Sequence, residues 1–150
     1  IETLELFLQM EKLRFGDKLN YTFEIDQNLE TAFIKVPNMI FQPHIENAVW
    51  HGIMHKKEDG EIKITFEMLS EEYFEVVISD NGIGREASKD LKSKSVTEHK
   101  SKGIKLTQNR IALINENHKM DISITFVDLT DNTGKAIGTE VRTKMKLVYV

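Results

Sequence analysis

Two stretches of alternating apolar and charged residues, separated by a short polar turn, constrain the fold of this chain more than any other feature. Residues 61–68 place apolar side chains on one side and charged ones on the other, and residues 73–80 repeat the alternation after a turn at 70–72. Successive side chains of a strand point to opposite faces, so both stretches indicate half-buried strands. The short turn makes them an antiparallel pair, and the chain must build a sheet with one covered face.

Further strands and helices extend this pair into a complete domain. The strands outnumber the long helices, and short turns join consecutive strands. We therefore expect an α/β (α+β) two-layer sandwich: a mixed, mostly antiparallel sheet with helices packed on one face. Apolar periodicity predicts the other elements, which are strands at 19–25 and 121–129 and another after 138, and helices at 1–15, 37–55 and 103–118.

The predicted helix at 37–55 carries two different faces. Pro37 and Asn38 are start signals for it. One stripe at helical spacing is apolar and is expected to face the core: Phe41, Ile45, Ala48, Val49 and Gly52. The neighbouring stripe is mostly polar and can face a ligand: Ile40, His44, Asn47 and His51.

The predicted helix at 103–118 offers two sets of apolar residues for the core. Either Ile104, Ile111 and Ile114 or Leu106 and Leu113 can supply it.

A glycine-rich segment follows directly on the strand at 73–80. It begins with Asp80 and continues Asn81, Gly82, Ile83 and Gly84. Glycine tolerates positive φ at little cost, so the backbone here can turn tightly and approach a planar or anionic ligand. An ordinary strand-ending turn is the alternative, because Asp-Asn-Gly is a common turn sequence.

Composition narrows the functional classes. A chain of 150 residues fits one domain. The net charge of −4 argues against general nucleic-acid binding, and the absence of cysteine excludes disulfides, thiolate metal sites and cysteine nucleophiles. No apolar run approaches the roughly 18 residues that a membrane span needs. Residues 85–102 contain many lysines and serines and few apolar side chains, and we expect them to form a mobile lid over a ligand.

Four features in one order resemble a known family. They are Asn47 within a helix, the Asp80–Gly84 segment, a polar segment ending at Gly103, and Gly138 before the last strand. This arrangement resembles the ATP-binding domain of the GHKL (Bergerat-fold) superfamily over nearly the whole chain. The segments PNMIFQPHIENAVWHGI and MEKLRFGDKLNY are most similar to bacterial sensor histidine kinases of the autolysis-sensor subclass.

The resemblance implies roles for the residues nearest the base and the metal. Asn47 corresponds to the asparagine that helps to hold Mg²⁺, a cation that prefers oxygen ligands. Asp80 corresponds to the carboxylate that accepts a hydrogen bond from the adenine amino group. Gly82 and Gly84 let the backbone pass beside the base and sugar, and Thr139 corresponds to a position near the adenine.

Other positions correspond to the phosphate-binding and catalytic parts of the family. Gly103 begins a helix whose free amide groups can receive phosphate oxygens, and Lys105 and Leu106 stand in the family's Gly-x-Gly-Leu segment. A glycine of that segment is replaced by Lys105, which can supply charge near the phosphates. Glu46 and His51 are candidates to orient an incoming imidazole or a phosphate during catalysis.

Phosphoryl transfer from ATP to a histidine is the reaction that the resemblance implies, with ATP and Mg²⁺ as ligands. Residues 1–18 are expected to be the end of a linker or dimerisation helix, and residues 19–150 the catalytic domain. The phosphoacceptor is expected upstream, on the dimerisation helices of a homodimeric parent, so the fragment alone should not phosphorylate itself. A response regulator is the expected downstream partner. The domain is expected to be cytoplasmic and its parent to be anchored in the inner membrane.

Three alternatives remain open at this stage. The first is a protein serine kinase of the same fold, of the anti-sigma type. The second is a nucleotide-gated scaffold without transfer activity, suggested because Trp50 stands where histidine kinases commonly have a lysine and because Lys105 replaces a glycine. The third is a metal site on His44, His51 and His55, whose spacing shares one helical face but lacks an HExxH pattern.

Overall fold

A five-stranded sheet forms one layer of the molecule. The computed structural model describes residues 1–37, 39–88, 101–118 and 120–149. The strands stand in the order β1-β2-β3-β5-β4. β1 runs parallel to β2, and the other three pairings are antiparallel, as expected of a mixed, mostly antiparallel sheet. Their bounds are β1 (Leu19–Ile25), β2 (Gly60–Met68), β3 (Tyr73–Asp80), β4 (Ser123–Thr130) and β5 (Ala136–Lys146).

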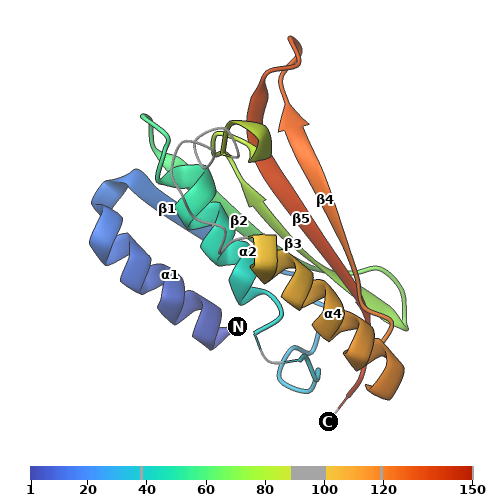
Figure 1. Cartoon of the computed structure of the whole chain (residues 1–150). Helices are drawn as coiled ribbons and strands as arrows, with labels where there is room; N and C mark the ends of the chain where they lie inside the picture. Colours follow the sequence, from blue (N-terminus) through green and yellow to red (C-terminus); the bar gives the residue numbers. More distant parts are fainter. Residues whose placement is uncertain (38, 89–100, 119, 150) are drawn as a thin grey trace.

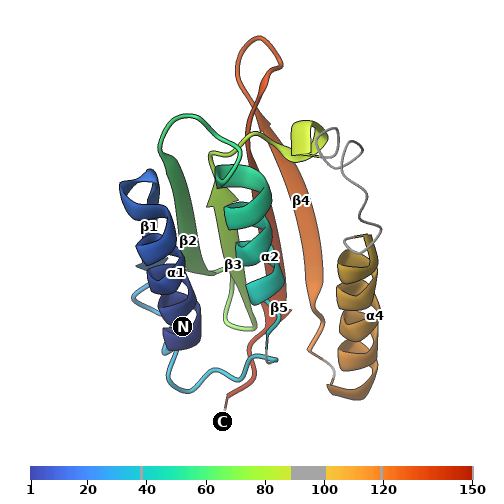
Figure 2. The same cartoon turned by 60° about the vertical axis from the view of Figure 1, so that its left-hand side comes forward.

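The helices form a second layer on one face of the sheet. Figure 2 shows α2 in front of the sheet, between α1 and α4. In Figure 1, α1 lies beside α2 and α4 lies toward the opposite side. The bounds are α1 (Glu2–Phe15), a short 3₁₀ turn η1 (Gly16–Lys18), α2 (Gln42–Asn47), its π-helical continuation η2 (Ala48–Ile53) and α4 (Ser101–His118). None of the helices in the described ranges is long and apolar enough to cross a membrane.

The start of α2 differs from the prediction that placed it at Pro37 and Asn38. Asn38 lies outside the described residues, and Met39 has a φ of 58°, which a right-handed helix does not accommodate. The helix begins at Gln42, so that Pro43 falls in its first turn, where a missing N–H costs nothing. Ile40 consequently precedes the helix and is buried in the core, so its expected place on the ligand-facing stripe was wrong.

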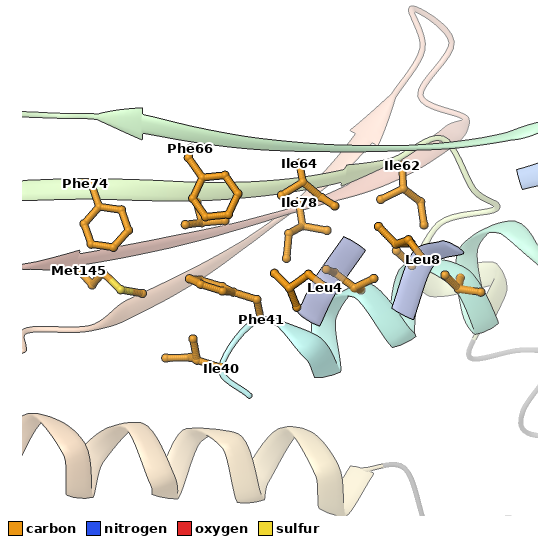
Figure 3. Packing of buried hydrophobic residues seen from close by; sticks show 14 of the residues in the cluster. Leu4, Leu8, Ile40, Phe41, Ile62, Ile64, Phe66, Phe74, Ile78 and Met145 are labelled. Atoms are coloured by element: carbon orange, nitrogen blue, oxygen red, sulfur yellow. The ribbon is translucent and has the colours of Figure 1, made fainter. Parts of the chain in front are cut away.

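The core lies between the helical layer and the sheet. Figure 3 shows side chains of β2, β3 and β5 converging on residues of α1 and of the segment that enters α2. The apolar stripe predicted for α2 is buried, and Leu4 and Leu8 of α1 belong to the same cluster. The largest fully buried side chains are Phe74, Leu8, Leu19, Ile45, Ile62, Ile64, Ile78 and Met145. Removing this apolar surface from water is the main stabilising contribution to the fold.

α4 begins two residues earlier than predicted, at Ser101, so Gly103 lies within its first turn. Ile111 and Ile114 are partly buried against the core, whereas Leu113 is exposed, which favours the isoleucine face of the two that the sequence offered. Asn115 fixes the C-terminal half of the helix to the sheet side, because its amide group exchanges two hydrogen bonds with the backbone of Ile122 at 2.7 and 2.8 Å. The lid expected at 85–102 lies largely outside the described residues.

Candidate functional site

The site is organised around Asp80, the last residue of β3. One oxygen of its carboxylate, Oδ1, accepts a hydrogen bond from the Gly82 amide at 2.8 Å. A Cβ at Gly52 of η2 would lie 2.6 Å from the same oxygen, and a Cβ at Gly138 of β5 would collide with the Asp80 carbonyl oxygen. Two elements, η2 and β5, therefore approach Asp80 more closely than a residue with a side chain would permit, and a Cβ at Gly82 would in turn collide with the Gly52 backbone. We call Gly52, Gly82 and Gly138 the glycine cradle.

Burial changes the acid–base behaviour of this carboxyl group. Only 7% of the Asp80 side chain is exposed. Desolvation raises the pKa of Asp80 to about 6, while hydrogen bonds from the amides of Gly82 and Thr139 and the charge of Lys56 oppose that rise. At pH 7 the group is therefore mostly an ionised, buried carboxylate that only accepts hydrogen bonds.

The loop after Asp80 is held by backbone contacts to both layers. The Asn81 side-chain oxygen accepts a hydrogen bond from the Glu61 amide of β2 at 2.8 Å. The Ile83 amide donates to the carbonyl oxygen of Gly52 at 3.3 Å. Gly84 has a φ of +83°, which a residue with a side chain would adopt only with strain. The loop is thereby fixed between the sheet and η2.

A cavity of about 330 Å³ opens against this arrangement. Several residues proposed from the sequence line it together although they lie far apart along the chain: Asn47, His51, Asp80, Gly84 and Thr139. His44, which the sequence placed on the same polar stripe as Asn47, also lines the cavity. The wall further includes residues that were not proposed as site residues: Gly52, Arg85, Ser88, Gln108 and Phe126. The His51-Gly52 pair is a sequence signal from which Gly52 could have been proposed. Phe126 and Gln108 reach the cavity through long-range packing, which no local pattern signals.

The other candidates lie outside the cavity wall or cannot be placed. Gly82 does not line the cavity but packs against η2, where a Cβ at this position would collide with the Gly52 backbone. Glu46 accepts a hydrogen bond from Gln42 one turn earlier, at 2.9 Å, and does not line the cavity. Gly103 stands in the first turn of α4, and the side chains of Lys105 and Leu106 lie outside the described part of the structure.

Trp50 also lies away from the cavity lining and instead joins η2 to α1. Its ring meets Phe15 edge-on, with the ring centroids 6.1 Å apart. The Arg14 guanidinium stacks over the indole at 4.4 Å from its centroid. The position that commonly carries a phosphate-directed lysine in histidine kinases therefore serves helix packing in this chain.

Arg85 braces the end of the glycine-rich loop against β4. Its guanidinium makes two 2.6 Å contacts with the Asp128 carboxylate and lies 5.3 Å from the Phe126 ring centroid. The Asp128 hydrogen bond raises the pKa of Arg85, which stays charged. This bidentate pair holds one edge of the cavity open toward β4.

The described residues contain no group of three or more His, Asp or Glu side chains that could hold a metal ion. His44 and His51 line the cavity, whereas His55 is exposed and does not. The structure therefore gives no support to a metal site on these three histidines. The oxygen donors in the cavity lining include the side-chain amide of Asn47 and the buried carboxylate of Asp80. An amide oxygen suits Mg²⁺ that keeps most of its ligands as water and phosphate.

Sequence relatives of this chain include bacterial sensor proteins. It is 34% identical over 111 residues to the uncharacterized protein YwpD of Bacillus subtilis, covering 74% of this chain and 39% of that protein. It is 27% identical over 116 residues to the sensor histidine kinase YpdA of Escherichia coli, covering 77% and 18%. It is 29% identical over 119 residues to the sensor protein LytS of Streptococcus mutans, covering 79% and 19%. The chain thus spans well under half the length of these relatives. No protein-family model matches it.

Solved structures with the same fold are histidine kinase domains. The catalytic domain of histidine kinase ThkA matches with a TM-score of 0.61 at 15% identity, over 97% of this chain and 90% of that one. Full-length ShkA in complex with AMPPNP matches with a TM-score of 0.56 at 11% identity, over 98% of this chain and 30% of that one. These findings confirm the fold and the family resemblance inferred from the sequence, and neither the serine kinase nor the scaffold is better supported.

Proposed function

We propose that this chain, which has the fold of histidine kinase catalytic domains and relatives among the LytS sensor proteins, is the ATP-binding catalytic domain of a sensor histidine kinase of the autolysis-sensor subclass. The observation that carries the proposal is the buried Asp80 carboxylate, held by the glycine cradle at the wall of a cavity that Asn47 and Thr139 also line.

Asp80 is suited to select adenine. One of its oxygens already accepts a hydrogen bond from the Gly82 amide. The ionised carboxylate has further lone pairs that can accept from a donor in the cavity. An exocyclic amino group supplies that donor, whereas a carbonyl oxygen at the same place would face the carboxylate without a proton between them. A base with a carbonyl there would leave Asp80 unpaired and desolvated, which is a strong basis for discrimination.

Asn47 is suited to the metal-bound phosphates, because it lies on the cavity wall one turn before His51. Mg²⁺, when bound, would neutralise phosphate charge during transfer. We assign Asn47 as its protein ligand and the N-terminal end of α4, which includes Gly103, Lys105 and Leu106, as the phosphate-binding helix end. His51 also lines the cavity, one turn after Asn47, and is a candidate to orient a phosphate or an incoming imidazole.

Glu46 is the weaker of the two catalytic candidates. It is bonded to Gln42 and does not line the cavity, so in this arrangement it can act only by moving or by holding the helix. If Glu46→Ala leaves phosphotransfer unchanged while nucleotide still binds, Glu46 has no catalytic role.

The phosphoacceptor histidine and the protein partners belong to the parent chain. We propose that the acceptor lies on dimerisation helices upstream, that residues 1–18 are the end of the linker to them, and that residues 19–150 are the catalytic domain. The parent would be a membrane-anchored homodimer whose phosphoryl group passes to a response regulator. The relatives YpdA and LytS are much longer than this chain, which covers only 18 to 19% of them, so they have room for further domains.

Calorimetric titration with Mg·ATP and with Mg·GTP tests the proposal on the chain itself. The wild-type chain should bind ATP and discriminate against GTP. Asp80→Asn should bind ATP at least about tenfold more weakly, because with its oxygen on the Gly82 amide its NH2 group, which only donates, would face the adenine amino group. Absence of ATP binding by a folded wild-type chain, up to millimolar nucleotide, would instead favour the scaffold. Transfer is then assayed in a chain extended upstream.

A further inference from the structure

His44 is a buried polar side chain without a polar partner. Only 5% of it is exposed, and neither ring nitrogen has a hydrogen-bond partner. Its nearest aromatic neighbour is Phe126 of β4, whose ring meets the imidazole edge-on at 5.8 Å. Burying an imidazole in this way costs free energy that an apolar side chain of similar size would not cost. The side chain nevertheless forms part of the cavity wall.

The protonation state of His44 defines what it can bind. Burial lowers its pKa to about 4, so the ring is neutral near pH 7. A neutral imidazole has one N–H donor and one bare nitrogen that accepts. It can therefore donate a hydrogen bond to a phosphate oxygen, or donate to or accept from a hydroxyl group.

The position of His44 on α2 indicates which part of a nucleotide it would meet. It stands three residues before Asn47 and so shares its helical face. Gly52, which touches the Asp80 carboxylate, lies eight residues further on, roughly 12 Å along the helix axis. With the base at Asp80 and the metal-bound phosphates at Asn47, as proposed above, the phosphates lie on the side of the cavity toward His44.

We propose that His44 binds the phosphate chain of the nucleotide, its ring N–H donating a hydrogen bond to a phosphate oxygen beside Asn47. The inference rests on the proposed ATP-binding function and adds a contact to it. Phosphate oxygens only accept, so the neutral imidazole serves as the donor. The ring already forms part of the cavity wall, so the contact requires only that a change of side-chain rotamer turn a ring nitrogen toward the cavity.

The test compares His44→Leu with His55→Leu, the same substitution at an exposed histidine outside the cavity. Mg·ATP and adenosine are titrated into each variant and into the wild-type chain. His44→Leu should bind ATP about tenfold more weakly and adenosine within about twofold of wild type. Its melting temperature should rise, because the unpaired nitrogens are gone, whereas a structural histidine would lose stability on removal. His55→Leu should change neither affinity.

Each other outcome overturns the assignment. If His44→Leu and the wild-type chain bind ATP equally well, His44 makes no contact with the nucleotide. If the variant loses affinity for ATP and adenosine equally, His44 contacts the sugar or the base and not the phosphates. If the variant does not fold, the ring nitrogen resonances of His44 in the wild-type chain decide: they should shift with Mg·ATP and not with adenosine. A wild-type chain that binds no ATP refutes the proposed function itself, which separates that failure from failure of the His44 contact.

Discussion

Gly52→Ala perturbs the Asp80 carboxylate without removing it. The new Cβ would lie 2.6 Å from Oδ1, whereas ordinary contact begins at 3.4 Å, so the carboxylate must retreat by roughly 0.8 Å. A displacement of that size breaks a hydrogen bond to a bound amino group. Hydrogen bonds to charged groups contribute about 1.5–3 kcal/mol, so ATP affinity should fall roughly 10- to 100-fold.

The stability of this variant should change far less than its affinity. Alanine favours a helix over glycine by about 1 kcal/mol, which offsets part of the strain. Calorimetry measures the affinity and thermal unfolding measures the stability. Gly134→Ala is the matched control, because Gly134 has a φ of +82° and no atom within 4 Å of its would-be Cβ. It should lose a little stability and no affinity. Unchanged ATP binding by a folded Gly52→Ala chain would refute the role given to the glycine cradle.

Four further predictions concern titration, packing and an ion pair. Lowering the pH through about 6 protonates Asp80, so ATP affinity should fall by up to about tenfold per pH unit below that value; titrations at pH 7.5, 6 and 5 check this. In the ligand-free chain, acid should have the opposite effect and stabilise the fold. The folded state binds a proton on Asp80 at about pH 6, whereas the unfolded state binds it only near the ordinary pKa of 3.8. The free energy of unfolding should therefore rise by up to about 3 kcal/mol between pH 6 and pH 4 relative to Asp80→Asn, as measured by denaturant titration. Trp50→Ala should destabilise the chain by about 2 kcal/mol, because Trp50 packs on α1, while Leu13→Ala, at an 88% exposed position, should change little. Breaking the exposed Arg85–Asp128 pair by Asp128→Asn should cost less than about 1 kcal/mol in the same assay.

The local patterns of the sequence predicted most of the sheet and one wall of the site. The alternation of apolar and charged residues predicted β2 and β3. A polar stripe at helical spacing correctly grouped Asn47 with His51 on the cavity side. The same spacing misplaced Ile40, because the periodic pattern continued past the true helix start. The positive φ of Met39 keeps the helix from starting earlier, and Pro43 in its first turn was a local start signal that the prediction passed over in favour of Pro37.

The remaining features of the site depend on contacts between distant segments. The need for glycine at position 52 follows from its approach to β3, and the unpaired state of His44 follows from Phe126 of β4. Trp50 could be recognised as unusual from the sequence, but its role required the packing of α1 against η2. Such pairings are set by the tertiary fold, so the sequence of either segment alone does not reveal them.

A structure of this chain with Mg²⁺ and a non-hydrolysable ATP analogue tests the central claim most directly. The account predicts the adenine amino group within hydrogen-bond distance of the Asp80 carboxylate, with the phosphates toward Asn47 and His44. A nucleotide bound elsewhere, or bound in the cavity with its base away from Asp80, would contradict it.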